Sequence, residues 1–131
     1  MKIELKEIDK DKLQVGDVVG VAREVSCSWS SSFRHKKIYE AKITRITPKR
    51  TKFFTDIFGE HDNKEIFYEL DSNAVKENHL AVLFGDFQHE VYELNEFKRN
   101  EGLGIISDSD LLIVAEHMKD ITKILEKYRK E

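Results

Sequence analysis

The hydrophobic period changes once along the 131-residue chain, near Asp71, and this change limits the folds that the chain can adopt. Before it, short apolar runs alternate with polar residues at every second position and are separated by turn signals such as Gly16-Asp17 and Pro48. After it, apolar residues recur at steps of three and four. The sequence therefore predicts an α+β fold, with antiparallel strands in residues 1–72 and a helical hairpin in residues 73–131.

Four or five short, bent strands are expected in residues 1–72. In "KIYEAKITRIT", Tyr39, Ala41 and Ile43 share one face, and Ile46 falls out of phase, which predicts a bulge or a strong bend near Thr44-Arg45. A small barrel would satisfy such strands best, because closure removes exposed strand edges.

The last strands are expected to form a hairpin. "TKFFTDIF" and "EIFYEL" bracket "GEHDN", whose glycine and polar residues are typical of a turn. Ile66, Tyr68 and Leu70 are predicted to point inward, which would leave Phe67 as an exposed aromatic residue.

The order "VGDVV", a variable loop, "YEAKITRITPKR", "KFFTD" and "FYEL" resembles small SH3-like barrels over residues 13–72. The string "ITRITPKRTKFFTD…FYEL" is also similar to short uncharacterised proteins of phages of Gram-positive bacteria. The resemblance implies an SH3-like antiparallel barrel in which residues 26–37 form the long loop beside the binding surface, and it implies a phage origin. Such barrels bind peptides, RNA, DNA or other proteins, and the resemblance does not choose among them.

Two amphipathic helices are expected after residue 72. One stripe consists of Leu80, Phe84, Phe87, Val91 and Leu94, and the second of Leu111, Val114, Met118, Ile121, Leu125 and Tyr128. Gly85 allows a kink or a break in the first helix, "NEGLG" supplies its C-cap, and Ser107 or Asp108 caps the second. The helices either fold on each other or on the barrel, or their stripes complete a homodimer or dock a partner helix.

The chain has a formal net charge of −3, and its basic and acidic residues are strongly segregated along the sequence. Residues 34–52 hold eight Lys/Arg against Glu40 alone, giving +7, whereas residues 53–131 hold nine Lys/Arg and eighteen Asp/Glu, giving −9. The basic pole suits a nucleic-acid backbone, and the acidic pole suits a basic protein surface.

The stretch "SCSWSSSFRHKK", residues 26–37, places the single tryptophan of the chain in a serine-rich segment beside basic residues. We interpret it as a contact arm, because flat aromatic faces stack on unpaired bases and basic side chains bind phosphates. The predicted nucleic-acid-binding residues are Trp29, Phe33, Arg34, Lys36, Lys37, Lys42, Arg45, Lys49, Arg50 and Lys52. The alternative is that Trp29 folds back, with Phe33 beside it, to plug the barrel end while the lysines only keep the surface solvated.

A second hypothesis uses the acidic helices. Glu93, Glu96 and Glu116 would present carboxylates to a basic groove, as expected of an inhibitor acting on a host nucleic-acid-handling complex.

Enzymatic motifs are absent from the sequence, so a non-enzymatic binding protein without cofactor or metal is expected. His35, His61, His79, His89 and His117 lack metal-ligand spacing. The alternative of a metal-dependent nuclease would rest on Asp17, Glu40 and Lys42, an acidic-x-Lys pattern that is common on polar strands.

A cytoplasmic location is expected. The charged N-terminus lacks the apolar core of a signal peptide, and no run of 18 apolar residues occurs. Cys27 is the only cysteine, so an internal disulfide cannot form.

Overall fold

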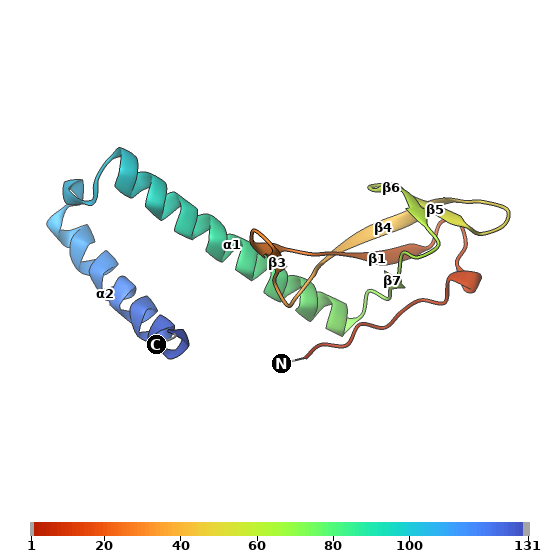
Figure 1. The fold of residues 1–131 in the computed structure, drawn as a ribbon, viewed down its shortest axis with the longest axis horizontal. Helices are drawn as coiled ribbons and strands as arrows, with labels where there is room; N and C mark the ends of the chain where they lie inside the picture. Colours follow the sequence, from red (N-terminus) through yellow and green to blue (C-terminus); the bar gives the residue numbers. More distant parts are fainter. Residues whose placement is uncertain (1, 130–131) are drawn as a thin grey trace. The chain divides into compact units, whose positions relative to one another are not determined.

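The computed structural model describes residues 2–129, and the chain has the predicted α+β class. Antiparallel strands come first and helices follow them (Figure 1). The chain divides into two compact units, Met1–His89 and Glu90–Glu131. Because the first part of helix α1 (Ser72–Asn100) belongs to the first unit, this boundary differs from the expected division between residues 72 and 73.

Within residues 2–129, one antiparallel sheet has the strand order β6-β5-β4-β1-β7. Its strands are β1 (Val18–Arg23), β4 (Lys37–Ile46), β5 (Lys52–Thr55), β6 (Gly59–Asp62) and β7 (Phe67–Tyr68). The register between β4 and β5 shifts between Ile43 and Arg45, which confirms the predicted bulge. A separate hairpin, β2 (Ser26–Ser28) and β3 (Ser31–Ser32), lies in the connection from β1 to β4.

One face of this sheet carries the hydrophobic core of the first unit. The buried side chains in this cluster are Leu13, Val19, Val21, Ala41, Ile43, Phe53 and Phe67. The rings of Phe53 and Phe67 meet edge to face with their centroids 5.8 Å apart. Burial of each large side chain contributes about 1.5–3 kcal/mol, so this cluster is the main source of stability for the sheet.

The predicted orientation of the last strand was wrong. Phe67 is 0% exposed in the core, whereas Ile66 and Leu70 are 41% and 39% exposed. The cause is the pairing with β1, which sets Phe67 beside the buried Val21. A strand read one residue out of register has every side chain on the opposite face.

The predicted turn "GEHDN" is mostly strand β6. The hairpin turn falls instead at residues 56–58, because Thr55 pairs with Gly59 and Phe53 with His61. The ring of His61 is buried, with Nε2 2.8 Å from Thr55 Oγ1 and Nδ1 3.0 Å from Glu65 Oε1.

The sheet is not closed into a barrel. Among the described residues, no strand pairing joins β6 to β7, so these two strands are its edges. β7 is only two residues long, and its outer edge is covered by the extended N-terminal segment, in which Ile8 N donates to Phe67 O and Glu69 N donates to Lys6 O, both at 2.8 Å. The β7 edge is therefore protected by this segment rather than by closure.

The first turns of helix α1 lie beside Ile38 at the start of β4 and beside Leu70. A Cβ at Gly20 would lie 3.1 Å from both Ile38 Cγ2 and Leu70 Cδ2, and Ile38 N donates to Asn78 Oδ1 of α1 at 2.8 Å. The helix continues through Gly85 to Asn100 and is followed by Gly102, which has φ 83° and donates its N–H to Phe97 O at 3.1 Å. The predicted helix and its glycine C-cap are confirmed, and the break at Gly85 is not present.

The second unit contains the end of α1, a short 3₁₀ turn η2 (Leu103–Ile105) and helix α2 (Asp108–Leu125), followed by the 3₁₀ turn η3 (Glu126–Tyr128). Ser107 Oγ accepts from Asp110 N at 3.2 Å, which confirms the predicted N-cap. No side chain of α2 is buried. Across the described residues, none of the helices combines the length and apolarity that a bilayer span requires.

Candidate nucleic-acid interface

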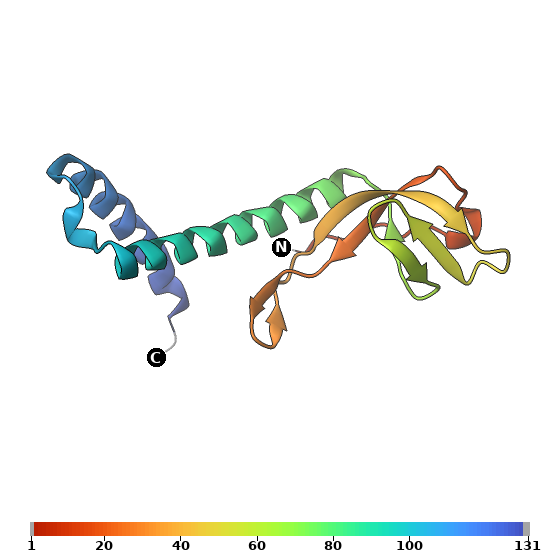
Figure 2. The same cartoon turned by 90° about the horizontal axis from the view of Figure 1, so that it is seen from above.

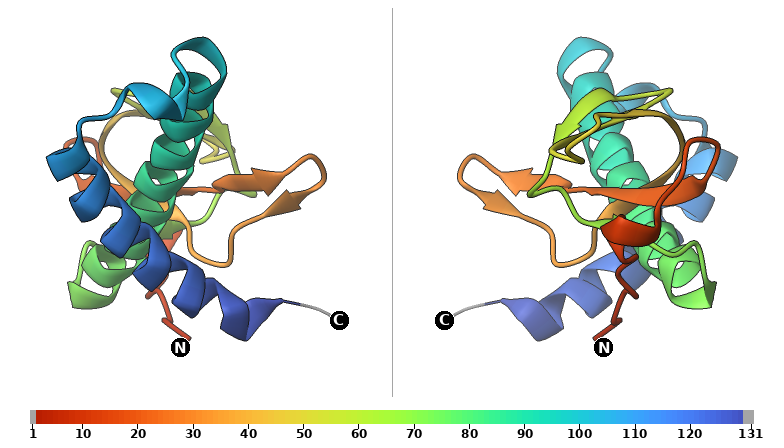
Figure 3. Two further views of the ribbon diagram at one scale, coloured as in Figure 1. Left: turned by 90° about the vertical axis from the view of Figure 1, so that its left-hand side faces the viewer. Right: turned by 90° about the vertical axis from the view of Figure 1, so that its right-hand side faces the viewer.

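The β2–β3 hairpin presents Trp29 to solvent. Trp29 lies at the turn between the two strands, and its side chain is 101% exposed. Figure 3 shows the hairpin extending away from the five-stranded sheet. The alternative that Trp29 plugs the sheet is therefore wrong, because its ring contacts no part of the core.

The base of this hairpin is held against α1. The rings of Phe33 and Phe84 are stacked with centroids 4.0 Å apart and an angle of 5° between planes. Gln88 Nε2 donates to Ser26 O at 3.1 Å, and Phe33 N donates to Val25 O at 2.7 Å. Phe33 is thus a structural anchor. Phe84 covers one face of its ring, so that face cannot stack on a base as predicted.

A buried carboxylate on α1 completes the anchor. Glu77 Oε1 lies 2.7 Å from Nδ1 of the buried His35, and Glu77 Oε2 accepts from Lys36 N at 2.8 Å. With Glu77 ionised, its oxygens only accept hydrogen bonds, and Nδ1 of His35 is then the donor in this contact. Glu77 was not among the residues predicted from the sequence. The signal for it is a carboxylate at helical spacing between Ala74 and Ala81, both of which are buried.

Three predicted basic residues lie at this base. The guanidinium of Arg34 lies 4.7 Å from the centroid of the Phe33 ring, and Lys37 Nζ lies 5.1 Å from the centroid of the Tyr39 ring. Lys36 is half-buried, and Arg34 and Lys37 are exposed. A cavity of about 260 Å³ is lined by Lys2, Ile3, Arg34, His35 and Glu77, so cationic side chains border a hollow beside the hairpin.

The other predicted basic residues lie toward the opposite end of β4. From Lys37 to Arg45 the strand rises about 26 Å, at roughly 3.3 Å per residue. Figure 2 shows the β2–β3 hairpin leaving one end of the sheet and the β4–β5 turn at the other. The structure therefore divides the predicted basic surface into two groups, with Lys42, Arg45, Lys49, Arg50 and Lys52 in the distal one.

Arg50 in this distal group points into the protein rather than toward a ligand. Its Nη2 donates to Lys10 O at 2.5 Å and to Leu13 O at 2.7 Å, and its guanidinium lies 5.7 Å from the centroid of the Phe53 ring. Its Nε is buried without a hydrogen-bond partner. Lys52 Nζ is 3.4 Å from Glu60 Oε1, and the Arg45 guanidinium is 5.1 Å from the centroid of the Phe54 ring.

The predicted acidic contact residues lie on both helices. Glu96 on α1 accepts from Arg99, and its second oxygen accepts from Asn100 Nδ2 at 3.1 Å. Glu93 on α1 and Glu116 on α2 are exposed.

Asp17 and Glu40, two residues of the nuclease alternative, lie in separate environments. Asp17 Oδ2 accepts from Gln14 N at 2.9 Å, and Glu40 lines a cavity of about 140 Å³ with Ile38 and Ala74. In the part of the chain that the structure describes, no group of three His, Cys, Asp or Glu side chains is placed to hold a metal ion.

Comparison of the chain with protein-family models, curated proteins and solved structures found no match.

Proposed function

We propose that this chain is a non-enzymatic binding protein that contacts single-stranded nucleic acid through the Trp29 arm, defined as residues 26–37. The observation that carries the proposal is the full exposure of Trp29 at the tip of an arm whose base is fixed to α1. A fully exposed indole offers both faces to a ligand, and stacking of one base on such a ring is worth about 1–3 kcal/mol.

The exposed aromatic face of Trp29 favours unpaired bases over duplex. Stacking requires a base whose face is free, which a single strand or a loop provides. The hydroxyl of Ser30, next to Trp29, can donate to phosphate or sugar oxygens. The phosphate backbone next to the stacked base would be bound by basic side chains at the base of the arm, those of Arg34, Lys36 and Lys37.

We also propose that the first unit is an open variant of the SH3-like barrel and that the protein derives from a phage. The strand order and the insertion of the hairpin between β1 and β4 support the first point, because the implied long loop occupies the same place in the chain. The string at residues 43–70 supports the second.

The test is a binding titration with fluorescently labelled oligonucleotides. Trp29→Ala is expected to weaken single-strand binding about 5- to 150-fold, the equivalent of 1–3 kcal/mol. Three phosphate contacts would give a slope of about −2 for the logarithm of affinity against that of salt concentration. The paired reversal of Lys36 and Lys37 to Glu should reduce both affinity and slope.

Arg45→Glu is the matched control, because it reverses one charge of the same basic run at the distal end of β4. It is expected to leave binding within about twofold of wild type, the effect of a remote and screened charge. Equal affinities for Trp29→Ala and wild type would contradict the proposal, as would failure to bind any single-stranded oligonucleotide at low salt.

A further inference from the structure

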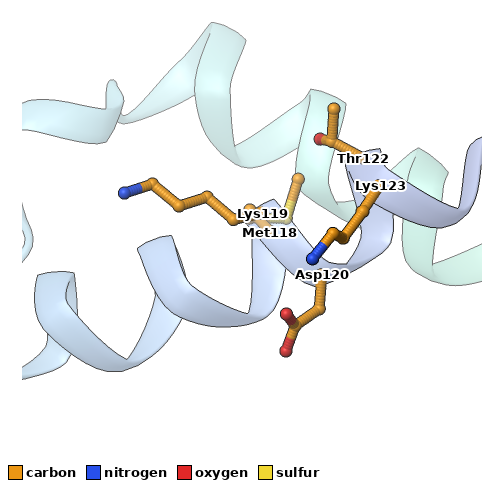
Figure 4. A pocket seen from close by; sticks show the side chains of 5 residues that line it. All are labelled: Met118, Lys119, Asp120, Thr122 and Lys123. Atoms are coloured by element: carbon orange, nitrogen blue, oxygen red, sulfur yellow. The ribbon is translucent and has the colours of Figure 1, made fainter. Parts of the chain in front are cut away.

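Helix α2 carries a continuous apolar stripe that the chain leaves exposed. The stripe consists of Leu111, Val114, Met118, Ile121 and Leu125 on α2, with Tyr128 in η3. Its α2 members are 37–49% exposed, and no residue of α2 is buried. Figure 4 shows Met118 and Thr122 pointing to the same side of the helix and Asp120 pointing to the opposite side.

The exposed surface is large enough for a specific interface. The stripe residues and the flanking Ile124 are 37–73% exposed, which leaves on the order of 80 Å² of each residue accessible to a partner. Together they offer roughly 550 Å² per copy, or about 1,100 Å² in a pair, and specific interfaces bury about 1,000 Å² or more. The 42-residue second unit has no buried apolar residue among those described, and units of this size usually need association to be stable.

We propose that the occupant of this stripe is α2 of a second copy of the chain, in antiparallel orientation. The steps between stripe residues are 3, 4, 3, 4 and 3, which read the same in both directions. Two antiparallel copies therefore set Val114 against Leu125 and Met118 against Ile121 in successive layers. This self-complementarity is what a two-fold interface requires.

The charges of α2 select the antiparallel orientation. Residues 108–116 contain Asp108, Asp110 and Glu116 and no Lys or Arg. Residues 119–129 contain Lys119, Lys123, Lys127 and Arg129 against Asp120 and Glu126. Antiparallel pairing places the acidic half of each helix level with the basic half of its partner, and opposes the two helix dipoles favourably. Parallel pairing would place like charges level with each other, and such charges set partner orientation in helical pairs.

The first test is the mass of the full chain by sedimentation equilibrium. Wild type is expected at twice the chain mass of 15.4 kDa. Ile121→Glu places a charge at the centre of the pair and should shift the dissociation constant upward by at least tenfold, with helicity retained by circular dichroism because Glu is a good helix former. Leu112→Glu is the matched control, since Leu112 is 74% exposed and lies off the stripe, and it should remain a dimer.

The second test is orientation by disulfide formation in a Cys27→Ser background. Antiparallel pairing predicts that Val114→Cys and Leu125→Cys chains form a mixed disulfide dimer when combined, and that neither forms one efficiently alone. A monomeric wild type at all concentrations would overturn the proposal, as would a dimer unaffected by Ile121→Glu. Efficient disulfides in each variant alone, without enrichment on mixing, would overturn the antiparallel orientation. Because Trp29 lies outside this helix, a failure of either test leaves the nucleic-acid titration interpretable on its own.

Discussion

Removal of the Glu77 carboxylate should detach the base of the Trp29 arm from α1. Glu77 is 6% exposed and holds two partners, His35 Nδ1 at 2.7 Å and Lys36 N at 2.8 Å. Loss of one member of a buried pair costs about 3–5 kcal/mol, because the remaining polar groups stay buried without a partner. Glu77→Ala is therefore expected to lower the free energy of unfolding by about 3–5 kcal/mol, a large part of the roughly 5–15 kcal/mol of a small domain.

Glu77→Gln separates charge from hydrogen bonding at the same position. The amide oxygen can still accept from Lys36 N, and the amide NH₂ can donate to Nδ1 of a neutral His35. Both contacts survive without the charge, and a hydrogen bond to a charged group is stronger than a neutral one by about 1–2 kcal/mol. Glu77→Gln is thus expected to cost about 1–2 kcal/mol, clearly less than the alanine variant.

Urea denaturation followed by far-UV circular dichroism measures both variants. Asp86→Ala and Asp86→Asn are matched controls, because Asp86 is exposed on the same helix, and they should change the unfolding free energy by less than about 0.5 kcal/mol. Hydrogen exchange at Lys36 N gives a local reading, since this amide should lose protection in Glu77→Ala. The reasoning is refuted if Glu77→Ala is no more destabilising than Asp86→Ala, or if the exchange of Lys36 N does not change.

Three other predictions concern Gly20 in the sheet, Gly85 in helix α1, and Tyr68. Gly20→Ala should lower the free energy of unfolding by about 1–3 kcal/mol in urea denaturation, because its Cβ would lie 3.1 Å from neighbouring side chains; a neutral result would mean that the site is not crowded. Gly85→Ala, with nothing within 4 Å of the added Cβ, should raise it by up to about 1 kcal/mol in the same assay through helix propensity alone, and a loss of stability would speak against a regular helix there. Burial, followed by the charges of Glu7 and Glu65, raises the pKa of the Tyr68 phenol above 10.0, so the unfolded chain releases this proton first and stability falls as pH rises above about 10. Tyr68→Phe should make that alkaline fall shallower in denaturation series at several pH values, and identical slopes would contradict it.

Local signals in the sequence predicted the helices well. Ser107 caps α2 and Gly102 follows the end of α1, because both roles depend on backbone groups within a few residues. The bulge between Ile43 and Arg45 was predictable for the same reason, as one residue out of phase is visible along a single strand.

The alternation of apolar and polar residues did not show which side chains of the short strands point into the core. Leu70 and Phe67 are both apolar, but the Leu70 side chain lies beside Gly20, whereas the Phe67 side chain lies in the core. A sheet covered on both faces supplies apolar residues at odd and even positions, so the period of two no longer identifies the interior. The pairing of Val21 with Phe67, which decides the matter, joins residues far apart in the sequence.

The candidate site was predicted in part. The basic residues form one run in the sequence, which predicts one surface, but β4 is long enough to carry Lys37 and Arg45 to different ends of the sheet. The anchoring of Phe33 on Phe84 and of His35 on Glu77 depends on α1 folding back over residues 26–37, and no local pattern in the loop encodes that contact. Trp29 can be identified from the local sequence alone, because a large aromatic residue among serines is unusual whichever way its side chain points.

The left-handed backbone conformation of Arg50 should make the residue at position 50 vary together with the length of the segment 10–13 among natural variants. Arg50 has φ 57°, a conformation that costs a non-glycine residue about 1–2 kcal/mol and that glycine adopts freely. Glycine would relieve this strain but would abandon the carbonyl groups of Lys10 and Leu13, which the Arg50 side chain binds. Natural variants that keep the length of the segment 10–13 should therefore retain arginine at position 50. Variants that insert or delete residues in that segment should be the ones that accept glycine, so the length of one segment and the identity of one distant residue are expected to change together.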